Sequence, residues 1–347
     1  MTSIDPIADR LCEPWMLGTL RVPNRVLLAP LAGIGNWFVR LQAKRYGAGM
    51  AVSEMVSTHA IHYGNEKTCT EMLRIDSRER TGGPVAIQLF GEDPAMMREA
   101  AARVASIGAD AIDINMGCPV AKVVKTGAGA ALLGQPDRAV EVARAAVEGA
   151  TADGRALPVT VKLRSGLRVG ETSGFDLAHR LVAEAGVAAI GFHPRSAAVQ
   201  HKGVPDYTLA ARLVDSLDAP VILTGGLSDA AHVREALART DAAAVMLARG
   251  ALGNPWLFAE LVAGRRDAPS HSEVLEELLW TIDCAVEHLG EARATRYLRK
   301  FYPWYVARLE LDAPDSKRLQ AALQQSETLE HVRELLQPRS AALAAAV

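Results

Sequence analysis

Short apolar runs alternate with longer amphipathic stretches between residue 26 and about residue 264. Each run is too short for a helix, and most are rich in Val, Ile and Leu, which is typical of strands that are buried on both faces. We therefore predict eight strands. The runs occupy residues 26–29, 50–53, 85–89, 111–115, 159–162, 189–193, 221–224 and 244–247.

The stretches between these runs are rich in alanine and have helical spacing. Several begin at a capping residue or an early proline, such as Asp93 before Pro94. Eight strand–helix units predict a closed (β/α)₈ TIM barrel. An open doubly wound sheet is the alternative, but its glycine-rich turn after the first strand is missing, because residues 29–33 read APLAG. The clearest helical stretches are residues 94–107, 137–148, 176–185 and 230–238.

The pattern changes after residue 264. Residues 265–270 read RRDAPS, a polar linker, and no strand-like run follows. We predict two domains: a catalytic barrel over residues 1–264 and a small all-helical domain over residues 265–347. A set of helices that only caps the barrel is the alternative for the second. Helical periodicity covers residues 272–289, 292–309, 316–325 and 328–336, with breaks at Pro303 and Pro314.

The composition, 49% hydrophobic and 22% charged residues, is that of a globular enzyme. The sequence has no apolar run of roughly 18 residues and no apolar core near its N-terminus, so we expect a cytoplasmic protein with no membrane partner. The four cysteines lie far apart without a CxxC pair, which argues against a disulfide framework or a metal site. No stable protein partner is implied. The net charge of −2 counts mildly against a nucleic-acid substrate.

Polar residues end several of the predicted strands. Gln88, Asn115, Lys162 and His193 all occupy such positions, and barrel enzymes place their chemistry there. A lysine at the end of an apolar strand carries a desolvation cost unless a partner compensates it. These residues therefore predict a polar or anionic ligand at the mouth of the barrel.

The last two strands are followed by glycine-containing turns. Residues 224–226 read TGG and residues 248–250 read ARG. Exposed backbone N–H groups and the Arg249 guanidinium are typical of the phosphate-binding corner of a barrel. Tight turns without a ligand are the alternative. A phosphate here would suit FMN, with Lys162 stabilising negative charge on the reduced ring and Gln88 hydrogen-bonding its pyrimidine edge.

The most distinctive segment, residues 113–119, reads DINMGCP. It places Cys118 just past a strand, on a loop over the barrel mouth. Lys122 and Lys125 lie nearby and would favour a thiolate or attract a phosphate backbone. A buried structural cysteine is the usual alternative, but this loop context favours a catalytic role.

These residues resemble the tRNA-dihydrouridine synthase family, which is flavin-dependent. The cysteine loop with Lys122 and the following GAG at residues 127–129 is the most specific motif. The resemblance extends from residue 26 to residue 258 and continues weakly into the tail, at residues 299–300 and 304–305. The other motifs are residues 28–33 with 38–40, 88–91, 161–166, 193–196 and 249–256.

The resemblance implies the reduction of specific uridines in tRNA to 5,6-dihydrouridine. It implies that FMN delivers a hydride to C6, that Cys118 protonates C5, and that NADPH reduces the flavin again. The implied FMN contacts are Pro30, Leu31, Ala32, Gln88, Lys162, His193, Thr224, Gly225, Gly226, Ala248 and Arg249. The implied substrate contacts are Asn115, Lys122, Arg164 and Arg195, with Arg296, Arg299 and Lys300 in the tail.

Three positions depart from the family pattern. Leu31 replaces a methionine, the Thr224 turn replaces Asn-Gly-Asp, and Ser196-Ala197 replace a threonine and an arginine. With the acidic pI of about 6.5, the altered turn favours an alternative, an FMN barrel that acts on a small molecule, as dihydroorotate dehydrogenases or ene-reductases do. Cys118 and the helical tail oppose it. An RNA-binding barrel without catalytic activity would have little use for Cys118 or Lys162.

The tail carries a row of basic residues at helical spacing beside Tyr297 and Trp304. Such a face would meet RNA phosphates, with the aromatic rings as stacking platforms. A solvated charged helix face is the common alternative. The basic residues are Arg293, Arg296, Arg299 and Lys300.

Overall fold

The computed structural model describes residues 6–152 and 154–337, which belong to two units. The first unit extends through Ala251 and includes Leu257–Arg265. The second unit contains Leu252–Trp256 and continues from Arg266. The sequence analysis assigned residues 252–256 to the barrel domain, but these residues group with the helices. Gly253 packs closely against the helical unit, because a Cβ at this position would lie only 2.6 Å from Cβ of Trp304.

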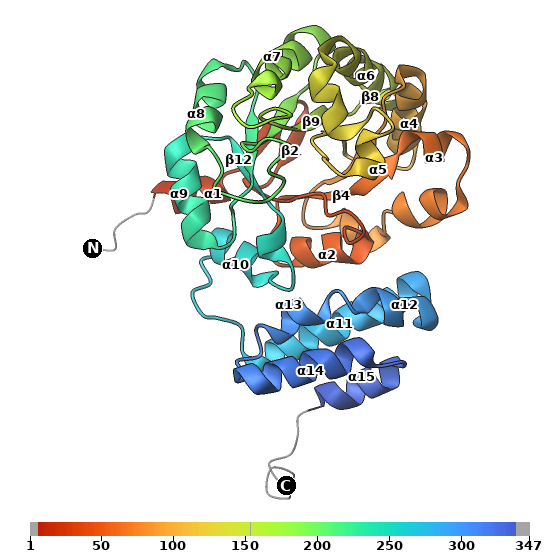
Figure 1. Ribbon diagram of the computed structural model, residues 1–347, viewed down its shortest axis with the longest axis vertical. Coiled ribbons are helices and arrows are strands. Elements are labelled where there is room, and N and C mark those ends of the chain that lie inside the picture. The colour runs from red at the N-terminus through yellow and green to blue at the C-terminus, as the bar shows by residue number, and fades with distance from the viewer. Residues whose placement is uncertain (1–5, 153, 338–347) are drawn as a thin grey trace, which may run out of the picture. The chain divides into compact units, whose positions relative to one another are not determined.

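Eight parallel strands close into a barrel in the first unit, which confirms the predicted fold (Figure 1). Each strand pairs with the next, and the last closes the ring, with Leu247 in register with Leu28. The second strand continues to Ser57, past the predicted end at residue 53, and a register shift between Val52 and Met55 interrupts its pairing. The strands are β3 (Val26–Leu28), β4 (Met50–Ser57), β5 (Val85–Phe90), β6 (Ala111–Met116), β9 (Val159–Arg164), β10 (Ala189–His193), β11 (Val221–Thr224) and β12 (Ala244–Leu247).

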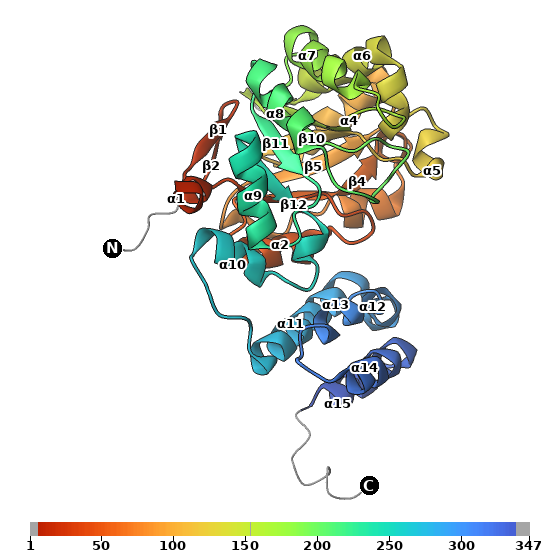
Figure 2. The same cartoon turned by 60° about the vertical axis from the view of Figure 1, so that its left-hand side comes forward.

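Helices connect these strands and surround the barrel (Figures 1 and 2). The predicted start at Asp93 is confirmed: its carboxylate accepts a hydrogen bond from N of Met96, and Pro94 occupies the first turn. The major helices are α2 (Trp37–Arg45), α4 (Pro94–Ser106), α6 (Pro136–Gly149), α7 (Ser173–Ala185), α8 (Tyr207–Ser216), α9 (Ala230–Thr240) and α10 (Trp256–Val262). Shorter pieces are α3 (Thr58–His62), η1 (Thr68–Met72), η2 (Ser77–Arg80), α5 (Ala121–Val124), η3 (Gly129–Gly134) and η4 (Arg249–Ala251). A small pair of strands, β7 (Thr151–Ala152) and β8 (Arg155–Ala156), follows α6.

An N-terminal hairpin, which the sequence analysis did not predict, packs against the first residues of the barrel strands. It consists of β1 (Trp15–Leu17) and β2 (Leu20–Val22), preceded by α1 (Pro6–Cys12) (Figure 2). Trp15, Leu17 and Val22 share one buried cluster with strand residues such as Met50 and Ala111. This cluster closes the N-terminal end of the barrel with apolar side chains.

The second unit consists of helices, as predicted. The predicted helical stretch 292–309 is divided in two, because Pro303 occupies the first turn of a new helix. The hydroxyl groups of Thr281 and Tyr305 lie 3.0 Å apart and link two of the helices. None of the helices in the described ranges is long and apolar enough to cross a membrane. The helices are α11 (His271–Leu289), α12 (Glu291–Leu298), α13 (Tyr302–Val306), α14 (Ala313–Gln325) and α15 (Leu329–Leu336).

Candidate active site at the mouth of the barrel

The strand register gathers the predicted strand-end residues inside the barrel. Asn115 on β6 is in register with Lys162 on β9, and Arg164 on β9 is in register with His193 on β10. Residues at one register level of a parallel sheet point to the same face. The polar residues that the sequence analysis singled out on these strands therefore share one end of the barrel interior.

The loop that carries Cys118 is held by the Asn115 side chain. Asn115 Oδ1 accepts hydrogen bonds from N of Gly117 at 3.1 Å and from N of Cys118 at 2.9 Å. The carbonyl of Cys118 accepts from N of Ala130 at 3.0 Å. Gly129 has a φ of +62°, and a Cβ there would lie 2.8 Å from that carbonyl. Cys118 is a free, half-buried cysteine on this fixed backbone, and it is an electrostatic neighbour of Lys162 and Arg164.

Arg164 and Arg195 are buried and bonded to their own surroundings. Arg164 Nε donates to the carbonyl of Gly117 at 2.9 Å, and its Nη1 donates to that of Gln200 at 2.7 Å. Arg195 Nη2 donates to the carbonyl of Gly203 at 2.6 Å. We predicted that these two arginines contact the substrate. The structure gives them partners that brace the loops after β6 and β10.

Positive charge accumulates at the mouth. Burial, and then the Arg164 charge, lower the pKa of Lys162 to about 8. Burial and the neighbouring Lys162 hold the pKa of His193 far below its usual range, so its imidazole is neutral. Burial, with the Arg195 charge, lowers the pKa of Arg164 to about 10. Among the described residues, neither Lys162 Nζ nor the exposed Arg249 guanidinium has a hydrogen-bond or ion-pair partner. The mouth therefore has positive charge to offer an anionic ligand.

The turn after β11 packs directly on His193. Gly225 has a φ of +100°, and a Cβ there would lie 2.4 Å from the His193 ring. Gly226 has a φ of +79°, and a Cβ there would lie 2.7 Å from the hydroxyl of Tyr207, which donates to the carbonyl of Gly225 at 2.9 Å. The backbone N–H groups of both glycines donate to no described residue. Two free N–H groups beside buried cations fit a phosphate or another oxyanion.

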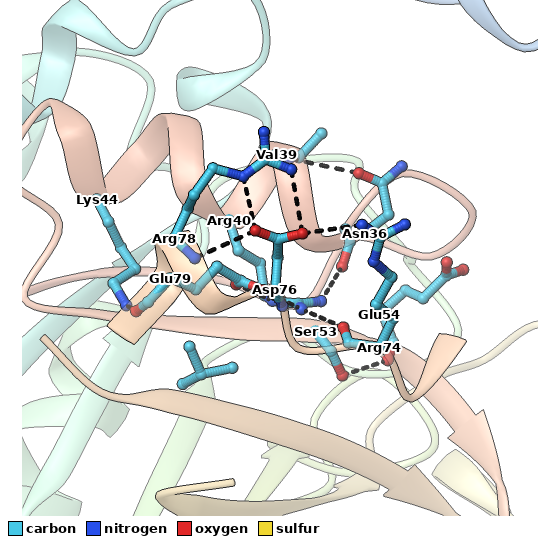
Figure 3. A network of polar contacts seen from close by, with 12 residues as sticks. Asn36, Val39, Arg40, Lys44, Ser53, Glu54, Arg74, Asp76, Arg78 and Glu79 are labelled. Atoms are coloured by element: carbon cyan, nitrogen blue, oxygen red, sulfur yellow. Dashed lines mark hydrogen bonds and ion pairs between the residues drawn. The ribbon is translucent and has the colours of Figure 1, made fainter. Parts of the chain in front are cut away.

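The loop after β3, which carries Pro30, Leu31 and Ala32, is anchored by a buried polar network (Figure 3). The carbonyl of Gly35 accepts from Arg40 Nη1 at 3.1 Å and from N of Glu54 at 3.0 Å. Pro30 is half-buried, Leu31 buried and Ala32 exposed. The three predicted cofactor contacts therefore lie on a loop whose end is fixed from outside the barrel.

An ion pair forms the centre of that network. Arg40 and Glu79 are fully buried, and their side chains are joined by hydrogen bonds of 2.7 and 2.9 Å. Asp76 completes a capping box with Glu79, and the hydrogen bond from Arg78 holds the pKa of Asp76 well below its usual range. The guanidinium groups of Arg74 and Arg78 lie 5.0 and 4.3 Å from the centre of the Trp37 ring.

Asp113 is a site residue that the sequence analysis did not single out. It is buried, and its two carboxylate oxygens accept from Thr160 Oγ1 at 2.5 Å and Gln88 Nε2 at 2.6 Å. Burial raises the pKa of this carboxyl group to about 6. Its position two residues before Asn115 could have identified it from the sequence, because residues i and i+2 of a strand point to the same face.

The remaining predicted residues lie at the ends of strands, on α5 or in the second unit. Lys122 is exposed on α5, and Thr224 and Ala248 end β11 and follow β12. Arg296 is exposed on α12. Arg299 and Lys300 have partners there: Arg299 Nη2 donates to the carbonyl of Ser326 at 3.3 Å, and Lys300 Nζ lies 3.8 Å from the centre of the Tyr297 ring.

Solved structures with a similar fold include a complex of 2-naphthoyl-CoA reductase with 2-naphthoyl-CoA. The TM-score is 0.60 at 13% identity, and the match covers 74% of this chain and 53% of that chain. At this identity the likeness shows the fold alone. The class that the fold defines is the (β/α)₈ barrel with polar strand ends.

Sequence comparison identifies the family. The model of the family "Dihydrouridine synthase (Dus)" matches residues 27–346. A probable tRNA-dihydrouridine synthase of Rhodobacter capsulatus is 37% identical over 333 residues, covering 94% of this chain and 99% of that protein. tRNA-dihydrouridine synthase B of Xanthomonas axonopodis pv. citri is 32% identical over 317 residues, covering 90% and 91%. The chain belongs to the dihydrouridine synthase family, which confirms the resemblance.

Proposed function

We propose that this protein reduces uridine bases in tRNA to 5,6-dihydrouridine, with FMN bound at the barrel mouth and NADPH as the reductant. The observation that carries the proposal is the braced Cys118 loop beside strand ends with uncompensated positive charge. Family membership and the names of the relatives, tRNA-dihydrouridine synthases, support the same reaction.

The residues at the mouth fit FMN. The free N–H groups of Gly225 and Gly226 and the Arg249 guanidinium suit its phosphate. Lys162 suits the negative charge of the reduced ring. When bound, the flavin supplies the hydride that goes to C6 of the base. The remaining assigned contacts are Pro30, Leu31, Ala32, Gln88, His193, Thr224 and Ala248.

Cys118 supplies the proton. As C6 of the uracil gains a hydride, electron density from the C5–C6 double bond moves to C5. The S–H bond of Cys118 breaks, a C5–H bond forms, and solvent later returns a proton to the thiolate. A thiol held on a fixed loop is a competent general acid. We assign Asn115 to orientation of the base and exposed Lys122 to a nearby phosphate. Arg164 and Arg195 hold the loops around the base.

The tRNA requires contacts beyond the mouth, because the target base must leave its stack to reach it. We assign phosphate contacts in the second unit to Arg296, Arg299 and Lys300. Exposed Arg296 is the least engaged of them, since Arg299 and Lys300 already have the partners described above.

The test is dihydrouridine formation on unmodified tRNA with purified, flavin-loaded protein and NADPH, measured by mass spectrometry. Dihydrouridine is expected with the parent protein. Cys118→Ala should slow its formation by roughly 10²–10⁴-fold, the usual contribution of a general acid, while NADPH still reduces the flavin at the parent rate. Cys69→Ala, which replaces another half-buried free cysteine, is the matched control and should behave as the parent.

Two outcomes would contradict the proposal. Unchanged turnover in Cys118→Ala would show that Cys118 is not the proton donor. Oxidation of NADPH by a flavin-loaded protein that forms no dihydrouridine on any tRNA would instead indicate a flavin barrel that acts on a small molecule.

A further inference from the structure

A chain of hydrogen bonds runs from a buried carboxylate to the backbone of the cysteine loop. Thr160 Oγ1 donates to Asp113 Oδ1 at 2.5 Å, and Gln88 Nε2 donates to Asp113 Oδ2 at 2.6 Å. Gln88 Oε1 accepts from Asn115 Nδ2 at 3.0 Å. Asn115 Oδ1 accepts from N of Gly117 and N of Cys118. Four side chains thus connect three strands with the loop that carries the thiol.

The direction of every bond in this chain is fixed at both ends. An ionised carboxylate can only accept, so Gln88 must turn its NH₂ group toward Asp113 and its oxygen toward Asn115. The backbone N–H groups of Gly117 and Cys118 can only donate, so Asn115 must turn its oxygen toward them and its NH₂ group toward Gln88. The two constraints agree. The donor and acceptor chemistry at the two ends therefore fixes both amide orientations.

We propose that Asp113 is a positioning residue, which acts through Gln88 and Asn115 to hold the backbone of Cys118 in place. This inference rests on the proposed role of Cys118. Asp113 is buried, and both of its carboxylate oxygens are occupied by Thr160 and Gln88. Its carboxylate fixes the Gln88 amide, the Gln88 amide fixes that of Asn115, and Asn115 holds the loop from which the thiol reaches the substrate.

Burial supports this role. Asp113 and Gln88 are 2% and 1% exposed, so water cannot easily replace either partner. The charged group coupled to Asp113 is Lys162 on β9, whereas the atoms bonded to it, on β5 and β9, are neutral donors. No cation is hydrogen-bonded to Asp113, so its oxygens accept only from the Gln88 amide and the Thr160 hydroxyl among the described residues.

Three variants separate the positioning role from a general effect on the core. Asp113→Leu removes the acceptor, so the amides of Gln88 and Asn115 can rotate. Asp113→Asn keeps an oxygen for Gln88 Nε2 and turns its own NH₂ group toward Thr160, whose hydroxyl then accepts. Thr160→Val removes the partner on the other carboxylate oxygen and leaves the chain from Gln88 to the loop complete.

The measurement is backbone hydrogen–deuterium exchange at Gly117 and Cys118 in the flavin-loaded protein, without tRNA. Asp113→Leu should speed exchange there by roughly five- to tenfold, the effect of losing one net hydrogen bond. Asp113→Asn and Thr160→Val should remain within about twofold of the parent. Single-turnover uridine reduction should follow the same order.

Unchanged protection of the loop in a folded Asp113→Leu protein would overturn the proposal. So would equal acceleration in Asp113→Asn, because loss of charge alone would then explain the effect. If Asp113→Leu does not fold, Gln88→Met breaks the next link and should give the same acceleration, and normal protection in that variant would also overturn the proposal. A protected loop in a parent protein that forms no dihydrouridine would contradict the proposed function and leave the positioning role standing.

Discussion

Two polar clusters in the barrel unit are built differently. Every guanidinium nitrogen of Arg40 has an acceptor, and its buried positive charge is matched by the negative charge of Glu79 (Figure 3). At the mouth, Lys162 and Arg249 lack such partners among the described residues. The carboxyl group coupled to Lys162, that of Asp113, bonds to neutral donors.

This difference distinguishes a network that stabilises the fold from a site that would bind a ligand. Burying a charge is costly unless a partner and hydrogen bonds compensate it. The Arg40 network is compensated from within the chain, so its role is to hold the loop after β3. The mouth is incompletely compensated, and an anionic cofactor would complete it. The desolvated charge of Lys162 is therefore a cost to the fold that binding offsets.

The largest expected effect on stability comes from breaking the Arg40 network. Arg40→Leu would leave the buried Glu79 carboxylate without its cation, which should lower the free energy of unfolding by about 3–5 kcal/mol. Urea denaturation of the cofactor-free protein measures this loss. Arg74→Ala is the control, because that side chain is 33% exposed where it pairs with Asp76, and it should cost less than about 1 kcal/mol. If Arg40→Leu also lowered the free energy of unfolding by less than about 1 kcal/mol, Glu79 would not depend on Arg40 for charge compensation.

A smaller effect is expected at the turn beneath His193. Gly225→Ala requires a positive φ and places a Cβ 2.4 Å from the imidazole ring. It should lower the free energy of unfolding by about 1–3 kcal/mol and weaken FMN binding, because His193 must move. Fluorescence titration with FMN measures the affinity.

Gly170→Ala is the matched control for this prediction. Gly170 has a φ of +82°, and a Cβ there would have no other atom within 4 Å, so that variant has the backbone strain without the clash. It should retain the parent's affinity for FMN. Equal affinity in Gly225→Ala would show that the position of His193 does not matter for the cofactor.

Local sequence patterns predicted much of the barrel. Strands buried on both faces are apolar throughout, and the caps at Asp93 and Pro94 depend on neighbouring residues only. The strand-end residues Asn115, Lys162 and His193 followed from the barrel, because parallel register brings the carboxyl ends together. The hairpin at residues 15–22 was missed because three-residue strands carry almost no periodic signal.

Long-range partners could not be predicted from the sequence. Arg40 and Glu79 are 39 residues apart, and no local pattern shows that they meet. The same limit applies to Asp113, which reads as a polar interruption of an apolar run until Thr160 and Gln88 surround it. The carbonyl partners of Arg164 and Arg195 likewise become visible only when the loops are folded, and the contact of these arginines with the substrate stays a prediction.

Lys162 should destabilise the protein without cofactor through its charge and should strengthen cofactor binding. Its pKa is about 8 in the folded protein and about 10.4 in an unfolded chain. Between these values the unfolded chain binds more protons, so the parent's stability should rise with pH across that window. Lys162→Met should make this rise smaller but not abolish it, because burial also lowers the pKa of Lys44 to about 8.

Urea unfolding of the parent and Lys162→Met at pH 7, each with and without FMN, tests this claim most directly. Without FMN, the variant should be more stable than the parent by about 1–2 kcal/mol, because no buried lysine has to be charged. FMN should stabilise the variant less than the parent, because its affinity is lower. A variant that is less stable without FMN, yet gains as much from FMN as the parent does, would show that the Lys162 charge neither destabilises the fold nor binds the cofactor.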